Sequence, residues 1–237
     1  MTLSEIQIPT ADMQLEGLLG IPEGPGPFPV VVVVHEIFGI DEAMRAQVAK
    51  LASLGYLAIM PNLFSRGGAR KCLTATFKSL TAQHGQAFDD VAAAKAYAQA
   101  LPQASKKVGV IGFCMGGAFA LVLAGRDYDV ASVNYGQLPA NLDEILAGAC
   151  PIVASFGAND KSLKGAPAKL EAALTAHSVA HDVKEYAQAG HAFMNSVGAG
   201  PKLLRPVLKR VLGVAPHPEA AADAWLRIDS FFKEQLA

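Results

Sequence analysis

The stretch from residue 108 to residue 124 constrains the fold most, because it joins two kinds of secondary structure across a glycine-flanked cysteine. Val108-Gly109-Val110-Ile111 is typical of a buried strand, and the apolar run Ala118–Ala124 has helical character. Between them stands Gly112-Phe113-Cys114-Met115-Gly116-Gly117. A turn this tight strains the backbone of its central residue, and a Cβ on the flanking residues would collide with it. The pattern therefore predicts a strand, a sharp turn and a helix.

This arrangement corresponds to the nucleophile elbow of α/β-hydrolases, usually G-x-S-x-G, with a cysteine in place of the serine. The first backbone N–H groups of the helix would then point toward a reacting carbonyl. The alternative is an ordinary strand-to-helix turn around a buried, inert thiol. The hexapeptide around Cys114 does not by itself decide between the two interpretations.

Two downstream turns favour the catalytic interpretation. In α/β-hydrolases the nucleophile, the acid and the histidine follow one another along the chain in that order. Here a strand-like run ends at Phe156 and leads into a glycine turn with Asp160, and a second run ends at Tyr186 and leads to Gly190-His191. An aspartate in a turn is usually only a turn residue. The order of the pieces, each at the carboxyl end of a strand, nevertheless predicts an acid and a base.

The run Val30–Val34 consists of five consecutive valines, which suits a central strand buried on both faces. It leads into His35-Glu36-Ile37-Phe38-Gly39, at the position of the loop that supplies the second oxyanion-hole N–H in α/β-hydrolases. A carboxylate on this loop would face the nucleophile across the strand ends. A zinc protease is excluded, because Gly39 stands where the H-E-x-x-H motif needs its second histidine.

Together these segments resemble the dienelactone hydrolase family, the carboxymethylenebutenolidases, over nearly the whole chain. The matching segments are His35-Glu36-Ile37-Phe38-Gly39, Gly112-Phe113-Cys114-Met115-Gly116-Gly117, Gly157-Ala158-Asn159-Asp160 and Gly190-His191-Ala192-Phe193. The resemblance implies an α/β-hydrolase fold and a carboxylic ester hydrolase of the EC 3.1.1 type. It also implies a Cys-His-Asp triad that acts through a thioester acyl-enzyme, with no metal and no organic cofactor.

The resemblance assigns a role to each site residue. Cys114 is the nucleophile, His191 the base and Asp160 its orienter, while Glu36 is the carboxylate that contacts the resting thiol and helps to remove its proton. The backbone N–H groups of the oxyanion hole belong to Ile37 and Met115. We also expect Tyr135, at the end of a neighbouring strand, and His35, beside the site, to line the substrate pocket.

One position departs from the family. The family holds its substrate's carboxylate with arginines, one of them shortly after the catalytic histidine, and Asn195 occupies that place here. An amide can hydrogen-bond a carboxylate but carries no charge. Arg66, Arg70 and Lys71 lie in a long loop that could carry another cation. We therefore expect a related lactone or a small ester as the substrate, with Asn195 in contact with it.

Two other functions remain open at this point. One is a general carboxylesterase or thioesterase of the same fold, which only a substrate profile would distinguish. The other is a non-catalytic binding protein or a thiol redox sensor, which the loss of a triad member would favour.

Composition predicts one α/β domain over residues 1–237, since 51% of the residues are hydrophobic and 17% are charged. The net charge of −1 gives no electrostatic reason to expect nucleic acid or a membrane surface as a partner. The three cysteines have no disulfide spacing, and the first residues carry no leader pattern. We expect a cytoplasmic protein, either a monomer or a small homo-oligomer.

Strand-like and helix-like runs alternate, which predicts a mostly parallel sheet with helices on both faces. Met13–Leu18 reads as an antiparallel edge strand, and Asp41 as the cap of the next helix. The stretch Asn62–Gln86 is expected to be irregular and only partly helical. The segment Ser196–His217 looks like an insertion, within which Lys202–Arg210 is expected to form an amphipathic surface helix.

Overall fold

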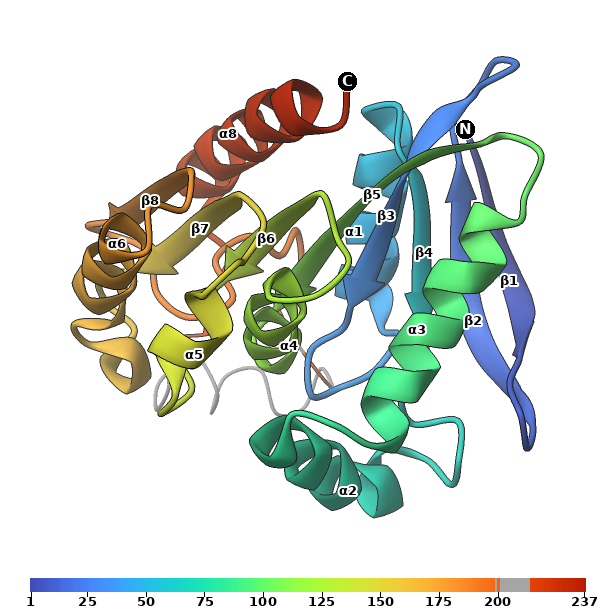
Figure 1. The fold of residues 1–237 in the computed structure, drawn as a ribbon, viewed down its shortest axis with the longest axis horizontal. Helices are drawn as coiled ribbons and strands as arrows, with labels where there is room; N and C mark the ends of the chain where they lie inside the picture. The colour runs from blue at the N-terminus through green and yellow to red at the C-terminus, as the bar shows by residue number, and fades with distance from the viewer. Residues whose placement is uncertain (199, 201–213) are drawn as a thin grey trace.

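A single eight-stranded sheet forms the centre of the computed structural model, which describes residues 1–198, 200 and 214–237 (Figure 1). The strand order is β1-β2-β4-β3-β5-β6-β7-β8. The β1–β2 and β2–β4 pairs are antiparallel and every other pair is parallel, which confirms the mostly parallel sheet. The strands are β1 (Thr2–Pro9), β2 (Gln14–Ile21), β3 (Phe28–Val34), β4 (Leu57–Pro61), β5 (Ala104–Phe113), β6 (Val130–Asn134), β7 (Ile152–Gly157) and β8 (His181–Tyr186).

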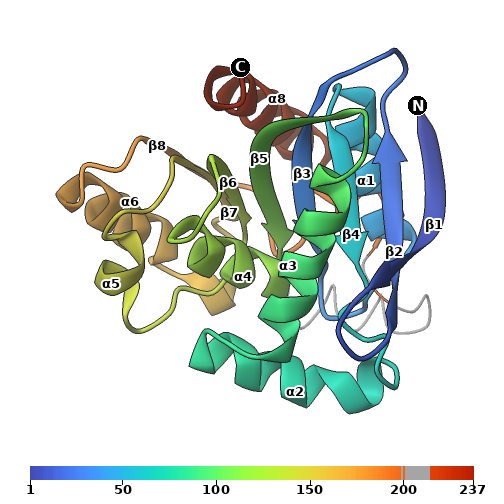
Figure 2. The same cartoon turned by 45° about the vertical axis from the view of Figure 1, so that its right-hand side comes forward.

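Helices cover both faces of this sheet, as predicted. Helices α3 and α4 pack on one face and α1 and α8 on the other, with α2 and α5 on the side of α3 and α4 (Figures 1 and 2). The helices are α1 (Glu42–Ser53), α2 (Ala69–Ala82), α3 (Gln86–Gln99), α4 (Met115–Ala124), α5 (Leu142–Leu146), the 3-10 turn η1 (Lys161–Leu163), α6 (Ala166–Ala176) and α8 (Pro218–Gln235). Within the described residues, none of them is long and apolar enough to cross a membrane.

The valine strand lies at the centre of the sheet. In β3 all of Val30–Val34 are fully buried, and Val32 pairs with Ile59 of β4 on one side and Val110 of β5 on the other. β-branched side chains pack well on a pleated surface that is covered on both faces. The prediction of a central, doubly buried strand is therefore confirmed.

The sheet edge and the segment after β4 differ from expectation. β2 is antiparallel, but the prediction that it forms the edge is wrong, because β1 pairs along its whole outer side. β1 has few inward side chains, with only Ile8 fully buried, and so it carries no clear apolar pattern. The segment after β4 forms the full helix α2, which buries Cys72 and Thr76 one turn apart. The helix expected at Lys202–Arg210 lies outside the described residues.

The cap of α1 is confirmed, since Asp41 Oδ1 accepts a hydrogen bond from the Met44 N–H at 3.0 Å. More important for function is the direction of the parallel strands. β3, β5, β6, β7 and β8 all end at one edge of the sheet, so the loops that follow them converge there.

Candidate active site

Cys114 occupies a strained turn between β5 and α4. Its backbone has φ 55° and ψ −116°, and its N–H donates to the Asn134 carbonyl at 3.0 Å. A Cβ on Gly112 would lie 1.8 Å from the Gly116 carbonyl oxygen, and one on Gly116 would lie 2.0 Å from the Val34 oxygen. Glycine is required at both positions because the start of α4 rests directly on the strand ends. The sequence prediction of a strand, a sharp turn and a helix is confirmed.

The loops after β7 and β8 bring Asp160 and His191 into contact. The Nδ1 atom of His191 lies 2.5 Å from Asp160 Oδ2, and Asp160 Oδ1 accepts from the Ser162 backbone N–H at 3.0 Å and hydroxyl at 2.6 Å. The two loops are joined by a hydrogen bond from the Asn159 N–H to the Ala189 carbonyl at 2.9 Å. Asp160 therefore fixes Nδ1 of the imidazole and leaves Nε2 for another partner.

Cys114 is the other side chain that acts on the imidazole, since its thiol is among the groups that raise the pKa of His191. Burial lowers the pKa of His191, but the hydrogen bond with Asp160 and the interaction with the Cys114 thiol outweigh this effect and hold the pKa above its ordinary value. Burial raises the pKa of Asp160, while its bonds with His191 and Ser162 bring it below its ordinary value. Asp160 thus orients the imidazole, and both Asp160 and Cys114 favour its protonated form.

Glu36 is a buried carboxylate on the loop after β3, only 2% exposed. Its Oε1 accepts from the Tyr135 hydroxyl at 3.3 Å, and the amide nitrogen of Asn195 lies 3.2 and 3.3 Å from its two oxygens. Burial raises the pKa of Glu36 to about 7, against the opposing influence of His191 and these hydrogen bonds. Such a carboxyl group can change its protonation state near neutral pH.

Asn195 has a different environment from the one expected of a substrate-binding residue. Its side chain is 2% exposed and inserted between Glu36 and α1, where its Oδ1 accepts from Gln47 Nε2 at 3.2 Å. The amide is therefore used within the protein. Asn195 lies on the side of Glu36 that faces α1, where its amide bonds Glu36 and Gln47. This position supports an indirect role, in which Asn195 acts through its hydrogen bonds to the Glu36 carboxylate.

His35 is likewise committed to internal contacts. It is fully buried; Nδ1 contacts the Glu36 carbonyl at 2.6 Å, and Nε2 accepts from the Leu63 N–H at 3.0 Å. Burial lowers the pKa of His35 to about 4, so the ring is neutral and joins the Glu36 loop to the segment after β4. Contrary to the expectation of substrate contact, both ring nitrogens are used by the backbone.

Tyr135 follows β6 with φ 41° and is fully buried beside the candidate catalytic groups. Its ring meets His191 edge to face at 5.2 Å between centroids, and its hydroxyl donates to Glu36. Burial, together with the nearby Glu36 and Cys114, raises the pKa of Tyr135 well above its ordinary value, so the phenol remains a donor. Tyr135 links the Glu36 side of the site to the His191 side.

The two backbone N–H groups expected in the oxyanion hole are available. Within the part of the chain that the structure describes, neither the Ile37 nor the Met115 N–H donates a hydrogen bond to another group. Met115 is the first residue of α4 and Ile37 directly follows Glu36. Two unused N–H groups, one on the loop after β3 and one at the start of α4, are what an oxyanion would need.

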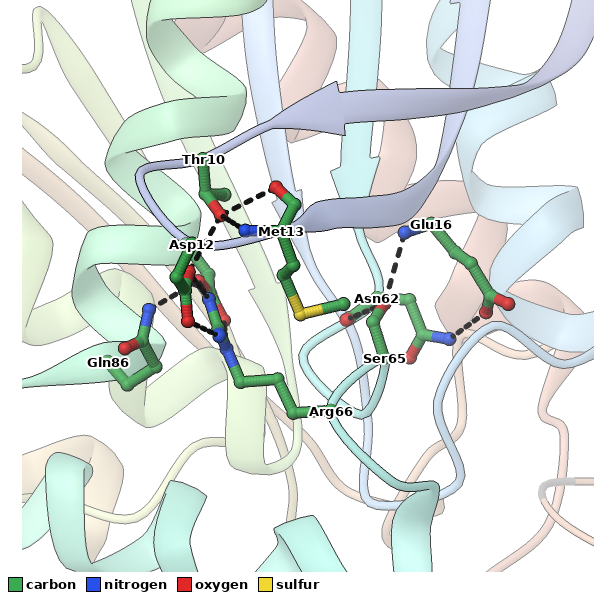
Figure 3. A network of polar contacts seen from close by, with 9 residues as sticks. Thr10, Asp12, Met13, Glu16, Asn62, Ser65, Arg66 and Gln86 are labelled. Carbon is green, nitrogen blue, oxygen red and sulfur yellow. Dashed lines mark hydrogen bonds and ion pairs between the residues drawn. The ribbon is translucent and has the colours of Figure 1, made fainter.

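Arg66, one of the cations considered for a substrate carboxylate, is already paired. It forms ion pairs with Asp12 in the β1–β2 turn and with the buried Asp90 of α3, to which Gln86 also donates at 2.8 Å (Figure 3). On the same loop, the Ser65 hydroxyl accepts from the Glu16 N–H at 3.1 Å. These contacts fasten the segment after β4 to the first hairpin. Arg70 and Lys71 remain exposed at the start of α2.

Two residues of the site were missed by sequence reasoning. Ser162, which holds Asp160, gave a weak signal as a hydroxyl two residues after an aspartate in a turn. Gln47 gave a clearer one, because it stands within the apolar stripe of α1 beside Met44, Val48 and Leu51, where a polar side chain needs a buried partner. Within the described residues, no group of three His, Cys, Asp or Glu side chains could hold a metal ion.

Comparison with known proteins identifies the family of this chain. The model of the dienelactone hydrolase family matches residues 15–236. A carboxymethylenebutenolidase of Pseudomonas putida is 30% identical over 211 residues, covering 84% of this chain and 89% of that protein.

Solved structures show the same fold. A dienelactone hydrolase-like promiscuous phosphotriesterase from metagenomic libraries superposes with a TM-score of 0.81 at 20% identity, over 100% of this chain and 99% of the other. A dienelactone hydrolase of Anabaena variabilis gives a TM-score of 0.74 at 17% identity, with the same coverage. At these identities the likeness establishes the architecture. The family model matches nearly the whole chain and so shows the family as well as the fold. This chain has the α/β-hydrolase fold, belongs to the dienelactone hydrolase family and is a hydrolase.

Proposed function

We propose that the protein hydrolyses a lactone or a small carboxylic ester through a covalent thioester on Cys114. The observation that carries the proposal is the His191–Asp160 hydrogen bond of 2.5 Å, together with the strained elbow that holds Cys114, whose thiol raises the pKa of His191. A nucleophile, a base and an orienting acid in this geometry are the parts that acyl transfer requires.

In the first half of the reaction, the Cys114 thiolate attacks the carbonyl carbon and the carbonyl π electrons move onto oxygen. The Ile37 and Met115 N–H groups stabilise the resulting oxyanion. Collapse of this intermediate re-forms the carbonyl and breaks the bond to the alcohol oxygen, which takes a proton from the His191 imidazolium. The product is a thioester on Cys114, and a lactone leaves its alcohol on the same molecule.

In the second half, His191 accepts a proton from water, and the hydroxide attacks the thioester carbon. The tetrahedral intermediate expels the Cys114 thiolate and leaves a carboxylic acid. Glu36 accepts the thiol proton before acylation and returns it to the Cys114 thiolate after the carboxylic acid has left, a role consistent with a carboxyl group whose pKa is about 7. The thiol is then protonated at rest and nucleophilic when substrate is bound.

The substrate class follows from the groups around the site. Asn195 carries no charge and is bonded to Glu36, and Arg66 is paired with Asp12 and Asp90. These features favour a neutral lactone or ester, and they also keep a general carboxylesterase or thioesterase as the second candidate.

The test is a rapid-quench experiment with short aryl esters and lactones, in which the intact protein mass is followed over time. The expected result is a transient acyl adduct that hydroxylamine removes and that is absent in Cys114→Ala and after iodoacetamide treatment. Turnover that survives in Cys114→Ala would overturn the thioester mechanism. A preference for acyl thioesters over all lactones would favour the second candidate.

A further inference from the structure

Gln47 connects helix α1 to the carboxylate of Glu36 through a chain of buried amides. Its side chain is 3% exposed, and Nε2 donates to the Met194 carbonyl at 3.0 Å and to Asn195 Oδ1 at 3.2 Å. Asn195 in turn directs Nδ2 at both oxygens of Glu36. Buried amides of this kind are costly unless every donor and acceptor is satisfied.

The direction of this chain is fixed at its outer end. A backbone carbonyl can only accept, so Gln47 must turn its NH₂ group toward Met194 O. The second hydrogen of this NH₂ group then faces Asn195, so the Asn195 side chain must present its carbonyl oxygen, Oδ1, as the acceptor. The NH₂ of Asn195 is thereby left for Glu36. A reversed Asn195 would set two NH₂ groups against each other and present its carbonyl oxygen to a carboxylate.

We propose that Gln47 is a positioning residue that orients the Asn195 amide, so that Glu36 receives hydrogen-bond donors and is kept as a proton-accepting carboxylate. This inference rests on the proposed role of Glu36 and extends it to a residue on another element. Hydrogen bonds to the charged form of a carboxylate favour that form, in opposition to burial. Asn195 is among the groups that hold down the pKa of Glu36.

Other charged and titratable groups also face Glu36. His191 after β8 favours the carboxylate, whereas Asp41 before α1 disfavours it. Tyr135 after β6 donates to Glu36 and faces Cys114 as well. No hydrogen bond or ion pair joins these groups to Gln47 in the described part of the chain. Replacing Gln47 therefore tests the amide chain without changing the other groups around Glu36.

The experiment follows Glu36 directly. Infrared difference spectroscopy would monitor the C=O stretch of the protonated carboxyl group against pH, with the band assigned by its loss in Glu36→Gln. In Gln47→Met, which keeps an unbranched side chain of similar size, the midpoint should rise by about one pH unit, the scale of a lost hydrogen bond to a charged group. The acid limb of thioester formation should move by the same amount, so acylation well below the midpoint falls about tenfold.

Three comparisons make the result specific. Gln86→Leu removes an exposed glutamine side chain from α3, outside this chain of amides, and should leave the midpoint unchanged. Asn195→Ala should raise the midpoint, and adding Gln47→Met to it should produce no further rise, because Gln47 acts through Asn195. Gln47→Ala provides a second variant that lacks the same donors, should the methionine variant fold poorly.

An unchanged midpoint in Gln47→Met or Gln47→Ala would overturn the proposal, as would a full additional rise in the Asn195→Ala background. A different result would contradict the proposed role of Glu36 in acylation without contradicting the role of Gln47. If Glu36→Gln forms thioester at the wild-type rate while the midpoint still shifts in Gln47→Met, then Glu36 is not the acylation base but Gln47 still orients Asn195.

Discussion

Nδ1 of His191 lies 2.5 Å from Oδ2 of Asp160, while the other oxygen of the same carboxylate is held by Ser162. The carboxylate thus has one oxygen for anchoring and one for the imidazole. This arrangement separates the orientation of Asp160 from its contact with His191, and the two can be tested by different substitutions.

Asp160→Asn should lower kcat/KM for a short aryl ester by about 10²–10⁴-fold. An amide NH₂ facing Nδ1 makes that nitrogen an acceptor and places the proton on Nε2, which can then no longer take a proton from water. Ser162→Ala keeps the Oδ2–Nδ1 contact and should cost less than about tenfold. Equal losses in the two variants would contradict this division of labour.

Gly116→Ala tests the close packing of α4 on the strand ends. The added Cβ would lie 2.0 Å from the Val34 oxygen, which is backbone and cannot move aside alone. The free energy of unfolding, measured by urea titration, should fall by more than about 2 kcal/mol. Gly148→Ala is the matched control, since it has open space around it and only a positive φ of 88°, with an expected cost of about 1 kcal/mol.

Arg66→Met tests the ion pairs that fasten the segment after β4. It leaves the carboxylate of Asp90, which is 2% exposed, with Gln86 as its remaining donor among the described residues. We expect a loss of about 2–3 kcal/mol in the free energy of unfolding, because the guanidinium is itself partly exposed. The double variant Arg66→Met/Asp90→Leu should recover most of this loss. A double variant as unstable as the single one would mean that packing of the Arg66 side chain dominates.

The central strand and the elbow could be predicted from the sequence because each depends on a local pattern. Five valines specify a doubly covered strand, and Gly112 and Gly116 stand where a Cβ has no space. The acid and the histidine were predictable by their positions after strands. β1 was not, because an edge strand with only Ile8 fully buried leaves almost no apolar pattern.

The direction of the Asn195 side chain could not be predicted from the sequence either. Spacing from His191 gave its position, but the turn between them contains Ala192 at φ 58° and is closed by a hydrogen bond from the Asn195 N–H to the Ala192 carbonyl at 3.2 Å. That turn directs the amide inward, to Glu36 and Gln47. Substrate contact was inferred from position alone, whereas the side-chain direction depends on backbone angles.

Asn195→Arg would introduce a cation beside Glu36. Asn195 and Gln47 also line a hollow of about 680 Å³ between α1 and α8, which gives the longer side chain space. The guanidinium should lower the pKa of Glu36 and shift the acid limb of acylation to lower pH. Because residue 195 lies behind Glu36, the cation acts on a substrate anion only at a distance, so the kcat/KM ratio of anionic lactones to neutral esters should rise by less than about tenfold. Asn195→Gln is the uncharged control. An unchanged ratio in Asn195→Arg would mean that substrate anions bind elsewhere.

Glu36→Gln should separate the catalytic role of this carboxylate from its effect on stability. A glutamine side chain cannot accept the thiol proton. Thioester formation, measured before the steady state, should therefore slow by about two orders of magnitude or more. If Glu36 only braces its loop through Tyr135 and Asn195, acylation would proceed at the wild-type rate. His191 would then be the sole activator of Cys114.

Stability should change in the opposite direction. The pKa of Glu36 is about 7 in the folded protein against an ordinary value of 4.5, so the unfolded chain releases this proton first as pH rises. The wild type therefore loses stability between about pH 4.5 and 7, and the loss persists above that window. Glu36→Gln removes the titrating group and therefore this loss. Its free energy of unfolding should exceed that of the wild type by up to about 3 kcal/mol at pH 8, and the two should be equal by about pH 4. Urea titrations of both proteins across this range would measure it. His191 titrates in both proteins, so only the difference between their two stability curves reports on Glu36. If that difference does not change with pH, the pKa of Glu36 is not raised in the folded protein.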